Sequence, residues 1–282
     1  MPAAATAGRV REALAAATDA LAAAGADTPR LDAELLLSEA TGWDRAKLAA
    51  EPDADIAPRA GRSFGEMVRR RVRREPVAYI LGRKGFRRLE VAVDRRVLIP
   101  RPESELLVEL AVEREARKAL DVGTGSGAIA LAVADELQEC RVVATDTSPA
   151  ALELARQNAE RLGLADRVRF ERGTVPEGER FDVVLANVPY VREDELADLS
   201  PEIVRYEPHE ALVAGPDGLQ AIAAVAPAAA AALGPDGLLA VEVAMGQAGE
   251  VAELLLDLGF REIEVRQDLA GTPRVVVAIG PP

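Results

Sequence analysis

Cysteine and histidine are almost absent from this sequence, with Cys140 and His209 as the only example of each. A single cysteine excludes an internal disulfide and any cluster of thiolates around a metal ion, so no metal site is expected. His209 follows Pro208 in a predicted loop, where we interpret it as a structural or surface residue. The chemistry of this chain must therefore be carried by other side chains.

Long hydrophobic runs are also missing. No stretch approaches the roughly 20 apolar residues that span a bilayer, so no transmembrane helix is expected. The alanine-rich N-terminus is interrupted by charged residues such as Arg9 and Glu12, so it lacks the continuous apolar core of a signal peptide. Apolar residues recur there at helical spacing instead and predict an amphipathic helix: Val10, Leu14, Ala17 and Leu21. We expect a cytoplasmic protein without a membrane partner.

Basic residues are outnumbered, with 34 lysines and arginines against 47 aspartates and glutamates and a net charge of −13. A general nucleic-acid binder needs a basic surface, so nucleic acid is not an expected partner. One local exception runs from Arg59 to Arg96 and is densest between Arg69 and Arg74. It is either a solvated helix face followed by polar loops or a docking surface for an acidic partner or RNA.

Residues 1–75 show only helix and turn signals. Thr28 and Pro29 form a helix start, a capping hydroxyl with proline at the first helical position, and Gly42 stops that helix. Pro76 then breaks a further helical pattern and marks a domain boundary. Residues 76–100 contain short alternating apolar runs and predict a β-hairpin linker.

From residue 118 onward strands and helices alternate, which predicts a mostly parallel sheet covered by helices. The expected strands are Ala119–Val122, Arg141–Thr145, Arg167–Phe170, Asp182–Ala186, Leu238–Val243, Ile263–Arg266 and Arg274–Ile279. In such a doubly wound domain the ligand binds at the carboxyl ends of the strands.

A glycine-rich loop follows the first of these strands, in the sequence Asp121-Val122-Gly123-Thr124-Gly125-Ser126-Gly127. Glycines at alternate positions let the backbone turn sharply and let a ligand approach closely. The G-x-G-x-G spacing differs from the G-x-G-x-x-G of dinucleotide enzymes, which argues against an NAD-dependent oxidoreductase. Asp121, at the strand end, is placed to meet a cationic or amino group.

Asp146 ends the second strand, about 20 residues beyond the glycine loop, where doubly wound nucleotide folds place an acid on ribose hydroxyls. Two oxygens on one carboxylate suit a vicinal diol. The alternative is an acid that only favours the N-terminus of the helix beginning after Ser148.

The fourth strand runs into Asn187-Val188-Pro189-Tyr190. In such a loop the Asn187 side-chain oxygen and the Val188 backbone carbonyl can point at one place, where a planar NH2 group with two donors needs two acceptors. Tyr190 could stack on a flat substrate group or supply a hydroxyl. By itself the spacing indicates only that the substrate group is a planar amide or amine.

The glycine loop and the Asn-x-Pro-Tyr motif together resemble the amino-methyltransferases. Further segments resemble the peptide chain release factor glutamine N5-methyltransferases over nearly the whole chain: PRLDAELLL, EPVAYILGRKGF, LIPRPESELLVELAV, YEPHEAL, GPDGL and VRQDLAGTPRVV. The resemblance implies an α/β fold with three parts. They are a helical substrate-recognition domain (1–75), a β-hairpin linker (76–100) and a Rossmann-like class I methyltransferase domain with a mostly parallel seven-stranded sheet (101–282).

By the same resemblance the enzyme methylates the glutamine of the Gly-Gly-Gln motif of class I release factors with S-adenosyl-L-methionine, and we expect it to act as a monomer. Gly123–Gly127 and Asp146 would hold the cofactor, and Asn187–Tyr190 the glutamine amide, with Asn187 also near the cofactor. The family usually has proline at Val188, and an acid and an aromatic residue at Gly173 and Thr174. By position, Thr174 is expected to contact the adenine.

Two other functions stay open at this stage. An adenine-N6 methyltransferase acting on RNA or DNA would present the same NH2 geometry, but it would need base extrusion and a basic channel. A cofactor-binding module without catalysis would leave the helical domain as the working part, and the intact Asn187–Tyr190 loop argues against it.

Overall fold

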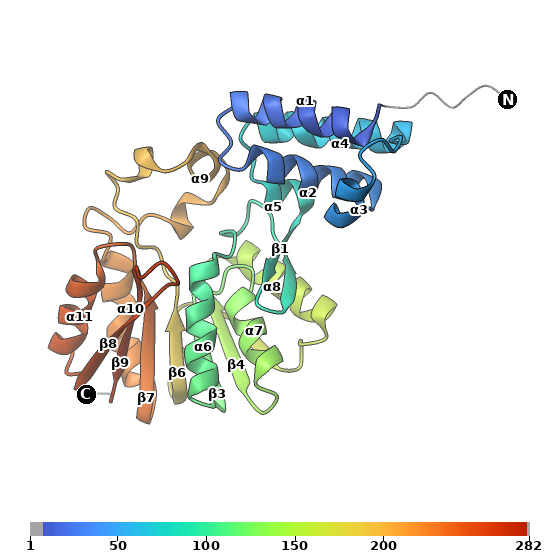
Figure 1. Cartoon of the computed structure of the whole chain (residues 1–282). Helices are drawn as coiled ribbons and strands as arrows, with labels where there is room; N and C mark the ends of the chain where they lie inside the picture. The colour runs from blue at the N-terminus through green and yellow to red at the C-terminus, as the bar shows by residue number, and fades with distance from the viewer. Residues whose placement is uncertain (1–7, 281–282) are drawn as a thin grey trace. The chain divides into compact units, whose positions relative to one another are not determined.

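The computed structural model describes residues 8–280, and residues 1–7 of the alanine-rich N-terminus lie outside them (Figure 1). The chain forms two compact units. Unit 1 comprises the chain up to Gly82 together with Ser200–Tyr206, and unit 2 comprises Arg83–Leu199 and the chain from Glu207 onward. Within residues 8–280, no helix has the length and apolar character needed to cross a membrane.

In the described residues of unit 1 the regular elements are helices, with one isolated β-bridge between Arg9 and Asp55. Its helices are α1 (Val10–Ala23), α2 (Pro29–Thr41), α3 (Arg45–Ala50), α4 (Pro58–Val72), α5 (Val77–Leu81) and α9 (Pro201–Tyr206). The apolar stripe expected for α1 is buried and packs in a core with residues such as Leu36, Leu37 and Phe64. Helical spacing of apolar residues alone thus specifies how α1 contributes to this core.

The start of α2 differs in detail from the expectation. Pro29 occupies the first turn and Gly42 ends the helix in the left-handed conformation, as the sequence signals indicate. However, the Thr28 hydroxyl makes no capping hydrogen bond to the helix backbone; it donates instead to the Asp32 side chain at 2.8 Å. Asp32 is buried, and an ion-pair network compensates its charge.

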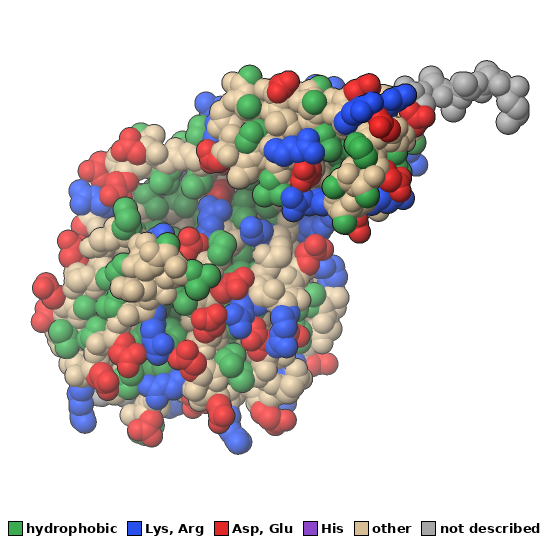
Figure 2. Space-filling model, in the orientation of Figure 1, with side chains coloured by type: hydrophobic (Ala, Val, Ile, Leu, Met, Phe, Trp, Pro, Cys, Tyr) green, Lys and Arg blue, Asp and Glu red, His purple; other side chains and the backbone are tan. Residues whose placement is uncertain are grey.

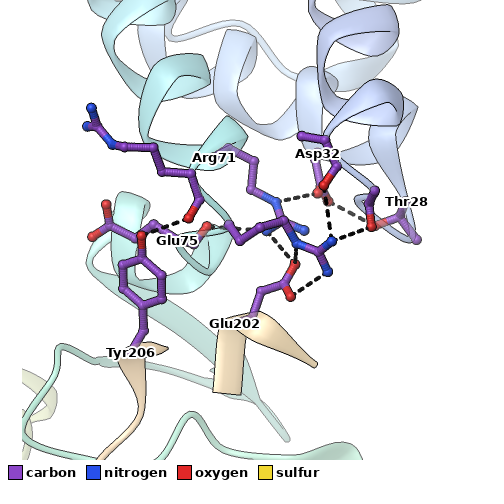
Figure 3. A network of polar contacts seen from close by, with 10 residues as sticks. Thr28, Asp32, Arg71, Glu75, Glu202 and Tyr206 are labelled. Atoms are coloured by element: carbon purple, nitrogen blue, oxygen red, sulfur yellow. Dashed lines mark hydrogen bonds and ion pairs between the residues drawn. The ribbon is translucent and has the colours of Figure 1, made fainter. Parts of the chain in front are cut away.

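The arginine run at the end of α4 is part of that network (Figure 3). Arg71 is buried and donates to Asp32 and to Glu202 of α9, each at 2.7 Å. Arg74 donates two hydrogen bonds to the same Glu202 carboxylate, at 2.7 and 2.6 Å. Arg70 donates to Glu75 at 2.8 Å. Arg71 and Arg74 therefore serve neither as a solvated face nor as a free docking surface, since they hold α9 within unit 1.

Unit 2 contains a hairpin of β1 (Arg83–Phe86) and β2 (Leu89–Ala92), and a seven-stranded sheet. The sheet strands are β3 (Lys118–Val122), β4 (Arg141–Asp146), β5 (Val168–Arg172), β6 (Phe181–Ala186), β7 (Leu233–Glu242), β8 (Glu262–Gln267) and β9 (Pro273–Ile279). The helices are α6 (Glu105–Glu113), α7 (Ala128–Glu136), α8 (Pro149–Leu162), α10 (Gln220–Ala231) and α11 (Ala248–Asp257).

The strand order is β5-β4-β3-β6-β7-β9-β8, with β9 antiparallel to β7 and β8 and the other pairs parallel. Consecutive residues of β3 and β6 are buried, so both faces of the sheet are covered. The expected α/β fold class, with its mostly parallel seven-stranded sheet, is confirmed. All seven expected strands are present; β7 begins at Leu233 rather than Leu238, with an irregular register against β6.

The sheet order reverses between β3 and β6, which lie side by side with Val122 opposite Ala186. A reversal of this kind opens a crevice beyond the carboxyl ends of the two strands. The glycine loop leaves β3 and the Asn-Val-Pro-Tyr motif leaves β6 at that point. The topology therefore brings together two motifs that lie about 60 residues apart in the chain.

The division between the two units falls after Gly82, later than the boundary expected near Pro76. Pro76 precedes the short helix α5 rather than ending the helical part, because proline is readily accommodated before the first helical turn. The hairpin belongs to unit 2 rather than standing alone as a linker. The segment Ser200–Tyr206, far along the chain, belongs to unit 1.

Candidate active site

A cavity of about 750 Å³ lies in unit 2 where β3, β4 and β6 end. Nine of the expected site residues line it: Gly123, Thr124, Gly125, Ser126, Asp146, Thr174, Asn187, Val188 and Pro189. Asp121, Gly127 and Tyr190 do not line it. The cavity thus combines the glycine loop, the acid of the second expected strand and most of the Asn-Val-Pro-Tyr motif.

The glycine loop depends on backbone conformations that other residues adopt poorly. Gly123, Gly125 and Gly127 have φ values of 77°, 54° and 82°. A Cβ on Gly123 would lie 2.9 Å from the Asn187 carbonyl oxygen, and one on Gly127 would lie 3.2 Å from the Ala155 Cβ. A Cβ on Gly125 would meet no heavy atom within 4 Å. The outer two glycines therefore permit close packing, while Gly125 leaves open space beside the cavity.

Asp146 joins the second strand to this loop. One carboxylate oxygen accepts from the Gly125 backbone N–H and the other from the Ser148 backbone N–H, both at 2.9 Å. Burial raises the pKa of Asp146, and these backbone donors oppose that rise. Asp146 lines the cavity, and its carboxylate holds the loop and the start of α8 in place. A contact with a ribose stays a prediction.

Asp121 occupies a different environment from the one expected. Its side chain is fully buried, and one oxygen accepts from the Thr124 hydroxyl at 2.6 Å and from the Ala130 backbone N–H at 3.1 Å. The other oxygen has no hydrogen-bond partner. Burial raises the pKa of Asp121 to about 7. Its contacts brace the loop from behind, and a direct contact with an amino group stays a prediction.

The Asn-Val-Pro-Tyr motif divides into an outward and an inward part. Asn187, Val188 and Pro189 line the cavity, and the Asn187 side-chain NH2 donates to the Ser104 hydroxyl oxygen at 3.0 Å. The Tyr190 hydroxyl points to the Glu242 carboxylate at 3.3 Å. Stacking of Tyr190 on a substrate stays a prediction, while its hydroxyl in this structure serves an internal contact.

Several buried polar residues support the site, although the sequence analysis assigned them no role. The Asn158 side chain of α8 bonds both backbone groups of Ala92 and the Ser126 carbonyl, so it ties the hairpin to the glycine loop. Glu207 accepts from Arg101 at 2.6 Å and from the Ile99 backbone N–H at 3.3 Å. Arg101 and Glu207 lie in the LIPRPES and YEPHEAL segments, which carry the family resemblance and could have indicated a role for these two residues.

Surface charge on the face of unit 2 that is visible in the lower part of Figure 2 alternates in sign, with acidic and basic side chains interspersed. His209 begins a short 3-10 turn, η3 (His209–Ala211), and does not line the cavity. In the part of the chain that the structure describes, no group of three or more His, Cys, Asp or Glu side chains is arranged to hold a metal ion.

The sequence of this chain is similar to family models and to known proteins. Residues 12–82 match the model described as the PrmC N-terminal domain, and residues 102–215 match the methyltransferase small domain. A release factor glutamine methyltransferase of Xylella fastidiosa is 43% identical over 264 residues, which cover 91% of this chain and 95% of the relative. One of Moorella thermoacetica is 42% identical over 277 residues, which cover 95% and 98%.

The chain belongs to the release factor glutamine methyltransferase family. The family expected from the sequence motifs is thereby confirmed. The match with the relatives is nearly end to end, so it includes the helical unit as well as the site in unit 2.

Two solved structures resemble about two thirds of this chain at low sequence identity. A methyltransferase from Pyrococcus furiosus has a TM-score of 0.52 and 20% identity, covering 68% of this chain and 88% of its own. The hMettl16 catalytic domain, solved with the MAT2A 3′UTR hairpin 6, has a TM-score of 0.56 and 14% identity, covering 67% and 74%. At these identities the likeness concerns the fold alone. It agrees with the expected Rossmann-like fold with a mostly parallel sheet.

Proposed function

We propose that the protein transfers a methyl group from S-adenosyl-L-methionine to the side-chain amide nitrogen, N5, of the glutamine in the Gly-Gly-Gln motif of class I release factors. The observation that carries this proposal is that Asn187, Val188 and Pro189 line the same cavity as the glycine loop. The names of the relatives supply the substrate, since the geometry by itself specifies only a planar group with two N–H donors.

The cavity fits the proposed cofactor. Gly125 leaves room beside the loop, Asp146 presents a carboxylate, and Thr174 lies on the same wall. These residues would hold S-adenosylmethionine, with Asp146 toward the ribose and Thr174 toward the adenine. When bound, it supplies a methyl group on a positively charged sulfur, which even a weak nucleophile can attack. Asp121 supports this arrangement by fixing Thr124 and the start of α7.

The glutamine amide needs help because its nitrogen lone pair is delocalised into the carbonyl. The Asn187 side-chain oxygen and the Val188 backbone carbonyl would accept one N–H each and aim the nitrogen at the methyl group. Orientation and exclusion of water then supply most of the acceleration. The nitrogen proton becomes acidic as the N–C bond forms and passes to solvent, so no strong base is required beforehand.

Adenine-N6 methylation is the competing function, because an exocyclic amine has the same two donors. It would need a basic channel for the nucleic acid. Three arginines of the basic run, Arg70, Arg71 and Arg74, are paired with carboxylates inside unit 1, and the net charge is −13. The similarity to the relatives also favours a protein glutamine as substrate.

We further propose that the enzyme works as a monomer in the cytoplasm, where translation takes place. Unit 1 would bind the release factor outside the glutamine itself.

The proposal is tested by supplying S-adenosylmethionine with a radioactive methyl group together with a class I release factor, and in parallel with RNA or duplex DNA. We expect label in the release factor with the wild type, and none with Asn187→Ala. Gln157→Ala, which changes an exposed amide on α8, serves as the matched control and should stay active. Label in nucleic acid but not in the release factor would favour adenine methylation instead.

A further inference from the structure

Behind Asn187 lies a line of buried polar side chains from separate segments of unit 2. Ser104 belongs to the 3-10 turn η1 (Pro102–Ser104), and Glu242 ends β7; each is 2% exposed. We propose that Ser104 and Glu242 are positioning residues that fix the Asn187 amide with its oxygen toward the cavity. This inference rests on the proposed function, in which that oxygen accepts an N–H from the substrate.

The orientation of Asn187 matters because its side chain has two chemically opposite ends. The carbonyl oxygen accepts hydrogen bonds, and the NH2 group donates them. Rotation by half a turn would exchange the two ends with almost no change of shape. The NH2 group of Asn187 would then face the NH2 group of the substrate, and neither could accept from the other. A working site must therefore exclude the rotated form.

Ser104 can make this choice because its hydroxyl carries a single proton. In the structure the Asn187 Nδ2 donates to Ser104 Oγ at 3.0 Å. The same hydroxyl could instead donate to a rotated Asn187, since serine is both donor and acceptor. It loses that option once its proton is committed to another acceptor. Ser104 then offers Asn187 only lone pairs, and only the NH2 end of Asn187 can satisfy them.

Glu242 is the acceptor that can take this proton. Its Oε1 accepts from the Tyr190 hydroxyl at 3.3 Å, while its Oε2 is buried without a hydrogen-bond partner. Burial raises the pKa of Glu242, and interaction with the hydroxyl groups of Ser104 and Tyr190 lowers it. In its ionised form the Glu242 carboxylate only accepts, so in the proposed arrangement the Ser104 hydroxyl donates to it, as the Tyr190 hydroxyl does. Arg274 favours the ionised form and Glu103 opposes it.

Tyr190 is the second hydroxyl donor to Glu242. Burial and the neighbouring Glu242 raise the pKa of the Tyr190 hydroxyl, so it keeps its proton and stays a donor. The Tyr190 backbone carbonyl in turn accepts from the Gln247 side chain at 2.9 Å. The inward part of the Asn-Val-Pro-Tyr motif thus anchors the carboxylate that, through Ser104, sets the direction of its outward part.

The test compares Ser104→Ala, Ser104→Thr and Glu242→Gln as full-length enzymes with a release factor as substrate. Ser104→Ala removes the hydroxyl, and Glu242→Gln lets an NH2 group face Ser104, so each should lower kcat by about 10- to 100-fold, as misorientation of reacting groups does. Ser104→Thr keeps the hydroxyl and should stay within about threefold of the wild type. The Kd for S-adenosylmethionine, measured without release factor, should change by less than about threefold in all three.

The cofactor Kd separates positioning from collapse of the site. Since the Asn187 backbone packs against Gly123, a general collapse would weaken cofactor binding together with kcat. A kcat of the wild-type level in Ser104→Ala or in Glu242→Gln would overturn the role of that residue. So would a parallel loss of cofactor affinity. If Ser104→Ala does not fold, the contrast between Ser104→Thr and Glu242→Gln decides the question in the same way.

The proposed function fails in a different manner. It fails if the wild type does not methylate the release factor, or if Asn187→Ala is fully active. If the wild type is active and Asn187→Ala is inactive, full activity of the Ser104 and Glu242 variants contradicts only the positioning role.

Discussion

The backbone carbonyl oxygen of Asn187 lies only 2.9 Å from the place where a Cβ on Gly123 would sit. The Val188 side chain would be 3.5 Å from the same Cβ. The glycine loop and the Asn187–Tyr190 loop are therefore in direct contact, and the glycine at position 123 permits it. This contact joins the two halves of the proposed reaction through the adjacent strands β3 and β6.

Gly123→Ala should strongly reduce activity. The added methyl group must displace the Asn187 backbone, and alanine is strained at a φ of 77°. We expect kcat to fall by about 100-fold, as it does when reacting groups are displaced by about 1 Å. Gly163→Ala is the matched control, because Gly163 has a φ of 71° and open space around its Cβ position. It should lose some stability and keep its kcat; an equal loss of kcat in both variants would argue against the contact.

Asp121 should make the stability of the protein depend on pH. Its pKa is about 7 in the folded protein, against about 4 for an unperturbed aspartate. The folded state thus holds a proton between these values that the unfolded state has lost. The free energy of unfolding should therefore fall as pH rises from about 4 to 7, by about 4 kcal/mol at most. Asp146 and Glu242, whose pKa values are also raised, act in the same direction.

Urea unfolding of the protein without cofactor, at pH 5 and at pH 8, measures this dependence. Asp121→Asn cannot titrate at this position, so it should show a clearly smaller difference between the two pH values than the wild type. An unchanged difference in the variant would mean that Asp121 keeps an ordinary pKa.

Arg71 should be essential to unit 1 because it neutralises two carboxylates within the fold. Arg71→Met removes the charge and leaves Asp32 and Glu202 without this partner, which should cost about 3–5 kcal/mol. Arg69→Met, at an exposed position of the same helix, should change stability by less than about 0.5 kcal/mol. Hydrogen exchange of Ser200–Tyr206 gives the local measurement. Faster exchange in Arg71→Met than in Arg69→Met is expected, and equal rates would contradict the role.

Glu207 should hold the segment that leads into the site. Glu207→Ala leaves the Ile99 N–H and Arg101 without their acceptor, and we expect a loss of about 1–3 kcal/mol. Glu195→Ala removes an exposed carboxylate and should be close to neutral. Chemical unfolding measures the free energy of unfolding of both variants. Two values equal to that of the wild type would contradict the role of Glu207 in holding Ile99 and Arg101.

The sequence was most informative where local signals repeat. Strand and helix periodicity predicted the seven strands of the sheet, because burial on both faces produces continuous apolar runs such as 183–186. The glycine loop and the Asn-Val-Pro-Tyr motif were found because positive φ angles and a fixed turn need particular residue types.

What the sequence could not supply were pairings between distant residues. Nothing local to Ser104 or Glu242 indicates that they meet beside Asn187, since three separate segments must fold first. For the same reason the sequence could not separate Arg71 and Arg74, which are paired inside unit 1, from Arg69 and Arg73, which are exposed. A cluster of like charges resembles a surface patch until its partners, Asp32 and Glu202, are placed beside it. The inward orientation of the Asp121 side chain likewise depends on α7 and on Thr124.

The most direct measurement is tandem mass spectrometry of the release factor after reaction with S-adenosylmethionine, read at the peptide that carries Gly-Gly-Gln. We predict one added methyl group on the glutamine side chain, and none when the enzyme carries Asn187→Ala. An unmodified glutamine in the wild-type reaction, or a methyl group at another residue, would contradict the proposal that this site orients a glutamine amide for methylation.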